Sequence, residues 1–214
     1  MCIRDRFING ESGKMGSSII KLINDHNFIK VEKIKLADVV IDFSHPNSTL
    51  KILQDCIKYK KPFVIGTTGL SKIHFKEIEE ASKVIPIFHS ANMSKGISNL
   101  KESLSNYVSK SSEPMSCIIE EIHHTEKIDT PSGTALELRD HIISIDNKNI
   151  ESIEITSKRI ENVFGIHKVS FVKKDGVTEF KHEALSRDIF ARGALDEARY
   201  INENEPLPGI YKNP

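Results

Sequence analysis

Cysteine is scarce in this 214-residue chain, which contains only Cys2, Cys56 and Cys117. The three are far apart and odd in number, and no two of them form a Cys-x-x-Cys pair. The spacing excludes a disulfide framework and a zinc ribbon. A chain of this kind fits a reducing, cytoplasmic setting.

Excess charge and long apolar runs are also lacking. The 30 basic residues balance the 30 acidic ones, so charge gives no reason to expect nucleic acid or an anionic membrane as a partner. No apolar run reaches the roughly 18 residues that a membrane helix needs. The opening MCIRDRF has no apolar segment of the kind found in signal peptides. We therefore expect a cytoplasmic protein that does not cross a membrane.

Short apolar runs alternate with longer amphipathic ones in the first half of the chain. Helices are predicted from Pro46 to about Tyr59 and after a cap at Ser71. Buried strands are predicted at VVIDFS (39–44), PFVIGTT (62–68) and VIPIFHSA (84–91). Continuous apolar strands separated by helices are typical of parallel βαβ units.

The first strand of this half is unusual, because Arg4, Asp5 and Arg6 do not suit a buried parallel strand. We expect the strand to begin near Phe7, unless the first six residues do not belong to the fold.

The pattern changes after Asn92. A helix over about 96–108 and an apolar strand ending at Ile122 are followed by ESIEITS (151–157), which alternates as a half-buried strand does. HKVSFVKKDGVTEFKHEA (167–184) predicts a hairpin around Asp175-Gly176. A last helix is expected over about 188–204. The second half therefore predicts a mixed or antiparallel sheet.

A glycine-rich loop, INGESGKMG (8–16), has Gly10, Gly13 and Gly16 at G-x-x-G-x-x-G spacing between an apolar run and an amphipathic helix start. Such glycines let the backbone approach a pyrophosphate, and the helix start supplies N–H donors. A plain glycine turn is the alternative, but the position at the first βα junction favours nucleotide binding. The ribose-reading residue is ambiguous: Glu32 is the nearest acidic residue, while Lys33 beside it could meet a 2′-phosphate.

The segment EEIHHTEKIDTPSGTALEL (120–138) places two histidines and a lysine just before a predicted helix. Thr130 or Ser132 can cap a helix entered through Pro131, and the amides of 132–134 would then point into the same space as the histidines. A carboxylate there would meet N–H donors and the helix dipole, and Lys127 could deliver a proton. The alternative for each feature taken singly is a solvated loop, a surface lysine and an ordinary helix entry. A metal site is not expected, because there is no His-Glu-x-x-His motif and no cysteine nearby.

The same segment resembles the signature of the 4-hydroxy-tetrahydrodipicolinate reductase family, E-x-H-H-x-x-K-x-D-x-P-S-G-T-A. The stretches GESGKMG, VIGTTG (64–69), SANMSKG (90–96) and HEALSRDIFARGAL (182–195) agree with further motifs of that family. The resemblance covers nearly the whole chain.

The resemblance implies an α/β fold with a Rossmann-like nucleotide-binding domain (residues 1–93 plus 187–214) and a second α+β mixed-sheet domain for substrate binding and oligomerisation (residues 94–186). It implies reduction of a cyclic dicarboxylate in the diaminopimelate route to lysine with NADPH or NADH, by a homotetramer. His123 would be the proton donor and acceptor and Lys127 the proton donor, while His124, Gly133 and Thr134 would hold the substrate. The cofactor would contact Gly10, Glu11, Ser12, Gly13, Lys14, Met15, Gly66, Thr67, Thr68, Ser90, Ala91, Asn92, Met93 and Arg187.

One departure from the family is the short segment 17–38 between the glycine loop and VVIDF, which leaves the choice between NADH and NADPH open. Two alternatives to the reductase also stay open. The chain could be another nicotinamide-dependent dehydrogenase of imino or amino acids, or a nucleotide-binding homologue with impaired catalysis.

Overall fold

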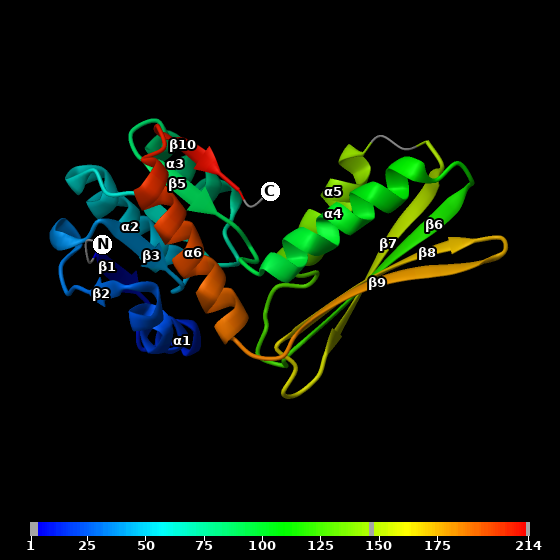
Figure 1. Cartoon of the computed structure of the whole chain (residues 1–214), viewed down its shortest axis with the longest axis horizontal. Coiled ribbons are helices and arrows are strands. Elements are labelled where there is room, and N and C mark those ends of the chain that lie inside the picture. Colours follow the sequence, from blue (N-terminus) through cyan, green and yellow to red (C-terminus); the bar gives the residue numbers. More distant parts are fainter. Residues whose placement is uncertain (1–3, 146–147, 213–214) are drawn as a thin grey trace. The chain divides into compact units, whose positions relative to one another are not determined.

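The computed structural model describes residues 4–145 and 148–212. It divides into two compact units (Figure 1). The first unit comprises Met1–Ser94 with Arg187–Pro214, and the second comprises Lys95–Ser186. Within the described ranges, no helix is both long and apolar enough to cross a membrane.

The first unit is built on a six-stranded sheet in which every pairing is parallel, in the order β10-β5-β4-β3-β1-β2. The strands are β1 (Arg4–Asn9), β2 (Phe28–Lys30), β3 (Val39–Asp42), β4 (Phe63–Ile65), β5 (Pro86–His89) and β10 (Gly209–Tyr211). The predicted parallel arrangement is confirmed. The strand order reverses direction between β1 and β3, and such a switch point is where open α/β sheets bind their ligands, at the carboxyl ends of the strands.

The short segment 17–38 explains why this sheet has few strands on the β2 side of β1. The standard doubly wound dinucleotide fold has two further strands beyond the one that carries the glycine loop, whereas in the described residues only β2 lies beyond β1. Two short 3₁₀ turns, Ile23–His26 and Ile34–Leu36, make the connections on either side of β2.

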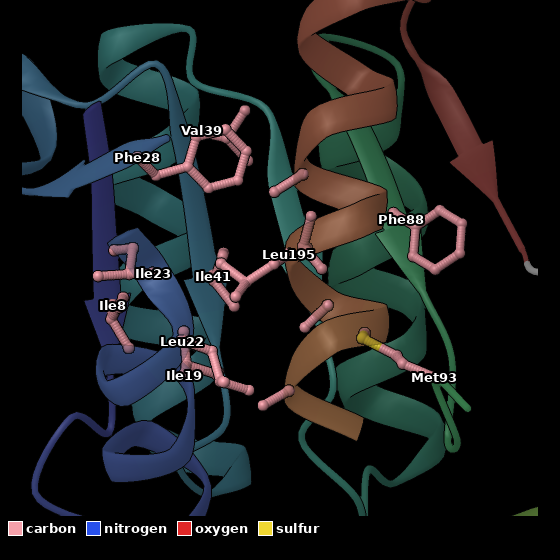
Figure 2. Close-up of a cluster of buried hydrophobic side chains, with 14 of the residues drawn as sticks. Ile8, Ile19, Leu22, Ile23, Phe28, Val39, Ile41, Phe88, Met93 and Leu195 are labelled. Atoms are coloured by element: carbon pink, nitrogen blue, oxygen red, sulfur yellow. The ribbon is translucent and has the colours of Figure 1, made fainter. Parts of the chain in front are cut away.

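Helices cover both faces of the sheet (Figure 1). On one face, α1 (Lys14–Leu22) and α6 (Asp188–Asn204) pack over Ile8 and Ile41, and Figure 2 shows Leu195 of α6 among these side chains. On the other face, α2 (Pro46–Tyr59) and α3 (Lys72–Ser82) enclose a second cluster. The helices predicted over 46–59 and about 188–204 are thus confirmed, and the cap at Ser71 lies directly before α3.

The prediction that the first strand begins near Phe7 is wrong, because β1 begins at Arg4. Arg6 is fully buried, with its guanidinium carbon 3.8 Å from the ring centroid of Phe28 and a terminal nitrogen 3.9 Å from the Asp38 carboxylate. A cation–π contact and an opposite charge offset the cost of removing the guanidinium from water. Both partners are distant in sequence, so the strand by itself gives no sign of them.

The second unit has a four-stranded mixed sheet in the order β7-β6-β8-β9. Strand β6 (Met115–His123) pairs parallel to β7 (Ile150–Arg159) and antiparallel to β8 (Gly165–Lys173), which forms the predicted hairpin with β9 (Gly176–Ala184). Helices α4 (Lys95–Lys110) and α5 (Gly133–Ser144) pack on one face of this sheet through an apolar cluster that includes Leu104, Ile119, Leu138 and Phe171. The expected mixed sheet is therefore confirmed.

Candidate functional site

The glycine loop connects β1 to α1 at the switch point of the first unit. Gly10 has φ +81°, and a Cβ there would lie 2.7 Å from the Phe43 carbonyl oxygen. A Cβ on Gly16 would lie 2.2 Å from the Gly10 carbonyl oxygen, so both positions exclude a side chain. Helix α1 begins at Lys14 with Gly13 as its N-cap. The loop therefore presents backbone close to a helix N-terminus, an arrangement that suits a pyrophosphate.

The two other predicted cofactor segments follow neighbouring strands of the same sheet. Gly66–Thr68 come directly after β4 and Ser90–Met93 come directly after β5. The adjacent strands β1, β3, β4 and β5 are parallel, so the glycine loop and both segments lie along one edge of the sheet. The second of these segments is tightly folded, because the Ser90 hydroxyl donates to the Asn92 carbonyl at 2.7 Å.

A buried carboxylate that the sequence reading missed links these loops. Asp42, at the carboxyl end of β3, is fully buried. It accepts hydrogen bonds from Thr67 Oγ1 at 2.9 Å and from the Asn9 amide at 2.8 Å. It also accepts from the hydroxyl and the backbone amide of Ser44. Its position at a strand end beside the switch point was the available signal, but Thr67 and Asn9, the partners that tie it to other strands, are 25 and 33 residues away.

Charged side chains gather where β2 ends. Lys30 Nζ lies 2.6 Å from Glu11 of the glycine loop and 2.9 Å from Glu32. The sequence reading named Glu32 and Lys33 but missed Lys30, although Lys30 is the last residue of β2. The position where an adenosine ribose is expected therefore combines a cation with two carboxylates.

The predicted histidine pair lies at the end of β6 in the second unit. The strand extends to His123, one residue beyond the predicted end, and His124 follows it. The His123 Nδ1 atom is hydrogen-bonded to Oε2 of Glu121, whose side chain is fully buried. Burial by itself would raise the pKa of Glu121, but hydrogen bonds from His123, Ser157 and Arg159 outweigh it and lower the pKa to about 2.

Lys127 and the start of α5 form the other side of this cluster. Lys127 Nζ lies 2.7 Å from Asp129 Oδ1, and the Gly133 amide donates to Asp129 Oδ2 at 3.3 Å. Burial would raise the pKa of Asp129, but the hydrogen bond from Lys127 leads the interactions that lower it. Of the two candidate caps, Ser132 is the one used, since its hydroxyl accepts from the Ala135 amide.

One detail of the predicted helix entry is corrected. Helix α5 begins at Gly133, and Pro131 lies before the cap behind a cis Thr130–Pro131 bond, rather than in the first turn. The Ser132 and Gly133 amides donate to the carboxylates of Glu121 and Asp129, and Glu121 is also bonded to His123. The helix start is thus an anion-binding position that already holds two carboxylates.

Arg159 and His167 also belong to this cluster, and the sequence reading missed both. Arg159, at the end of β7, bonds both oxygens of Glu121 at 3.0 and 3.1 Å. His167 on β8 lies edge-on to His123 with ring centroids 5.0 Å apart. Both looked like ordinary members of alternating strands, because nothing local to 150–173 indicates what lies on the neighbouring strand.

Two further predicted site residues lie at the starts of helices. Arg187 is the N-cap of α6 in the first unit, whereas Thr134 is buried in the first turn of α5 in the second. In residues 4–145 and 148–212 no group of three or more His, Cys, Asp or Glu side chains is arranged to hold a metal ion.

Two family models match the chain. The model described as "Dihydrodipicolinate reductase, C-terminus" matches residues 97–213, and the one described as "Dihydrodipicolinate reductase, N-terminus" matches residues 27–93. The second match begins after the glycine loop, so the loop's assignment depends on its geometry and on full-length relatives.

Curated relatives match over almost the whole chain. The 4-hydroxy-tetrahydrodipicolinate reductase of Rickettsia rickettsii is 36% identical, covering 96% of this chain and 98% of the relative. That of Bdellovibrio bacteriovorus is 34% identical, covering 95% and 91%.

Solved structures share the fold. A dipicolinate-bound dihydrodipicolinate reductase from Paenisporosarcina sp. TG-14 has a TM-score of 0.72 at 17% identity, covering 99% of this chain and 98% of that one. An amine dehydrogenase from Mycobacterium smegmatis has a TM-score of 0.66 at 6% identity, covering 98% and 95%. The two-unit plan is therefore common to enzymes with different substrates.

Proposed function

The chain belongs to the dihydrodipicolinate reductase family, and from that premise we propose which of its residues perform the reaction. The chain is an NADH- or NADPH-dependent oxidoreductase that reduces 4-hydroxy-tetrahydrodipicolinate in the diaminopimelate route to lysine. The assignment of nucleotide binding to the first unit, of substrate binding to the second and of individual roles to residues is our proposal.

The nicotinamide nucleotide, when bound, supplies the hydride. The glycine loop fits a dinucleotide, because Gly10 and Gly16 lie against the backbone of Phe43 and Gly10, where a Cβ would clash, and this tight turn leads directly into the N-terminus of α1. We assign the pyrophosphate to Gly10–Met15 and the nicotinamide half to Gly66–Thr68 and Ser90–Met93. Arg187, the N-cap of α6, is assigned to the cofactor as well.

Proton delivery is assigned to His123 and Lys127. The observation that carries this assignment is that each faces a buried or half-buried carboxylate, Glu121 and Asp129 respectively, beside the start of α5. Hydride addition to the substrate ring leaves electron density that must gain a proton. Lys127 can supply that proton as an ammonium group, and His123 can pass a proton at its Nε2 atom.

The substrate carboxylate is assigned to Gly133 and Thr134, with His124 beside them. The first turn of α5 already attracts the Asp129 carboxylate through the Gly133 amide. A substrate carboxylate has the same chemistry and would compete for those donors at a helix N-terminus.

The test is steady-state kinetics with enzymatically generated substrate and either cofactor. Lys127→Ala and His123→Ala should lower kcat by about 10²–10⁴-fold, the usual contribution of a positioned acid or base. Thr134→Ala should mainly raise KM, since its contact is made in both ground and transition states. Lys110→Ala, an exposed lysine at the end of α4, is the matched control. Near-normal kcat in a folded Lys127→Ala protein would remove the proton-donor assignment.

The two alternatives give different results in the same assay. A dehydrogenase of other imino or amino acids, whose fold the amine dehydrogenase shares, would turn over those substrates better. A binding protein would bind NADH but turn over nothing. Loss of nucleotide affinity in Gly13→Val, whose Cβ would lie 3.2 Å from the Gly10 carbonyl oxygen, would support the loop assignment in either case.

We also propose a homotetramer assembled through the second unit. On β6, Ile118, Glu120 and Ile122 alternate with the buried core residues, and Ile118 is 36% exposed. A sheet with helices on one face needs a cover for the other when that face carries apolar side chains. Light scattering at micromolar concentration tests this, and a monomer would contradict it.

A cytoplasmic location is proposed as well. Both described cysteines, Cys56 and Cys117, are buried free thiols, as expected of a chain folded in a reducing compartment.

A further inference from the structure

Glu121 lies two residues before His123 on β6, so the two side chains project from the same face of the strand. Its side chain is fully buried. Oε2 is bonded to His123 Nδ1, and Oε1 accepts from the Ser132 amide at 3.3 Å and from Arg159 Nη1 at 3.0 Å. The carboxylate therefore connects the end of β6, the end of β7 and the cap of α5.

An ionised carboxylate can only accept hydrogen bonds. Facing Glu121, the Nδ1 atom of His123 must therefore carry the ring proton, which leaves Nε2 as the atom that can take up and release a proton. Gly165 on β8 lies on the Nε2 side, where an added Cβ would be 3.1 Å from that nitrogen. A glycine there leaves the reactive nitrogen uncrowded.

The guanidinium of Arg159 joins Glu121 to the segment that bears Lys127. Its Nε donates to the Lys127 carbonyl at 3.3 Å, and its Nη2 donates to the Asp129 carbonyl at 2.6 Å and to Thr130 Oγ1 at 3.0 Å. A planar group with five donors can hold a carboxylate and a loop backbone at once, which a lysine ammonium at the same place cannot.

We propose that Glu121 and Arg159 are positioning residues of this reductase. Glu121 fixes the ring orientation and tautomer of His123, and Arg159 ties that carboxylate to the backbone of Lys127. The two proton-handling side chains are thereby set by a single buried ion pair. The inference rests on the proposed roles of His123 and Lys127, but the tautomer of His123 can be measured without any turnover.

A merely structural ion pair would act differently. Buried ion pairs are weak evidence of stabilisation, since apolar replacements are often tolerated. Removal of a structural pair would change stability while leaving the tautomer of His123 and the pH profile of kcat as they were. Removal of a positioning pair changes both.

The first measurement is ¹⁵N NMR of histidine-labelled wild-type protein over a pH series, with His123 assigned by comparison with His123→Gln. We expect the neutral ring of His123 to carry its proton on Nδ1 rather than on Nε2. A neutral form protonated at Nε2 overturns the proposal by itself, even if no Glu121 variant folds.

The second measurement is the Glu121→Gln variant. The amide oxygen should take the place of Oε1, which faces the donors of Arg159 and Ser132, and the NH₂ group would then face His123 Nδ1. That donor favours the opposite tautomer, so kcat should fall by about 10²-fold, as for loss of a positioned acid–base group. KM should change by less than about threefold, as expected when the lost effect acts on the chemical step, and the pH profile of kcat should shift.

The matched control is Glu120→Gln. Glu120 is adjacent, projects from the other face of β6 and pairs with Lys158 at 2.6 Å, so kcat should be unchanged.

Arg159→Lys, which keeps the positive charge and loses the planar guanidinium with its five donors, should lower kcat by about tenfold or more through the same positioning effect. Wild-type kcat and pH profile in folded Glu121→Gln would overturn the Glu121 role, and the same result for Arg159→Lys would overturn the Arg159 role. Absence of turnover by the wild-type protein would count against the proposed function instead.

Discussion

His167 should make the second unit sensitive to acid well above the pH at which carboxylates titrate. It is almost completely buried on β8, and burial is the first cause that lowers its pKa from 6.5 to about 3. The groups facing it are His123 and Glu121 on β6, His182 on β9 and Lys127, of which only Glu121 raises the pKa. His167 is therefore neutral in the folded protein at pH 5, where it would be protonated in the unfolded chain.

The sign of the effect follows from proton binding. Between pH 6.5 and about 3 the unfolded chain binds a proton that the folded chain does not, so stability falls as the pH falls through this window. The contribution is fully present above pH 6.5. Between pH 7.5 and pH 5 the loss due to His167 should be about 2 kcal/mol, from roughly 1.4 kcal/mol for each pH unit below 6.5.

The assay is urea unfolding at a fixed protein concentration, at pH 7.5 and pH 5, followed by circular dichroism and by intrinsic tyrosine fluorescence, to which Tyr107 contributes from the second unit. His167→Gln removes the titrating ring and leaves a polar group near Ser132 Oγ, which lies 3.3 Å from His167 Nε2. The variant should lose about 2 kcal/mol less than the wild type between the two pH values. His45→Gln, at an exposed position before α2, is the control.

Parallel losses of stability in the wild type and in His167→Gln would refute the reasoning. Comparing the two proteins cancels the contribution of His89, whose pKa burial lowers to about 4 and which both proteins keep.

Three further outcomes are expected. Gly193→Ala places a Cβ 1.7 Å from the Met93 carbonyl oxygen and should lower the free energy of unfolding by about 1–3 kcal/mol or more, as overpacking does. Gly176→Ala, whose Cβ would have no atom within 4 Å, should leave stability nearly unchanged. Equal urea midpoints for the two variants would contradict this prediction. Cofactor choice should be permissive, with less than about a hundredfold preference between NADH and NADPH in kcat/KM. Lys30→Ala should lower kcat/KM for NADPH more than for NADH, because without the lysine the carboxylates of Glu11 and Glu32 would repel a 2′-phosphate. An equal effect on both cofactors would show that Lys30 does not read the ribose. Ile118→Lys should reduce the assembled mass measured by light scattering while leaving circular dichroism unchanged, and an unchanged mass would place the interface elsewhere.

The sequence by itself determined most elements and the type of each sheet. Continuous apolar runs such as VVID require burial on both faces and so indicate parallel strands, and ESIEITS alternates because only one face of β7 is covered. The position of the glycine loop and the residue types of 120–138 also indicated a nucleotide and an anionic substrate, because those chemistries depend on local spacing. The roles of these residues remain predictions.

Tertiary structure decided the features that depend on partners distant in the chain. Arg6 could be buried only because Phe28 and Asp38 lie beside it, and Gly209–Tyr211 became a strand only by pairing with β5. The same holds for the cluster around His123. Glu121 and Arg159 are 38 residues apart, and only the parallel pairing of β6 with β7 brings the two together. A charged residue within an alternating strand looks solvated from its neighbours in sequence, and whether it is buried and paired is decided by the adjacent strand.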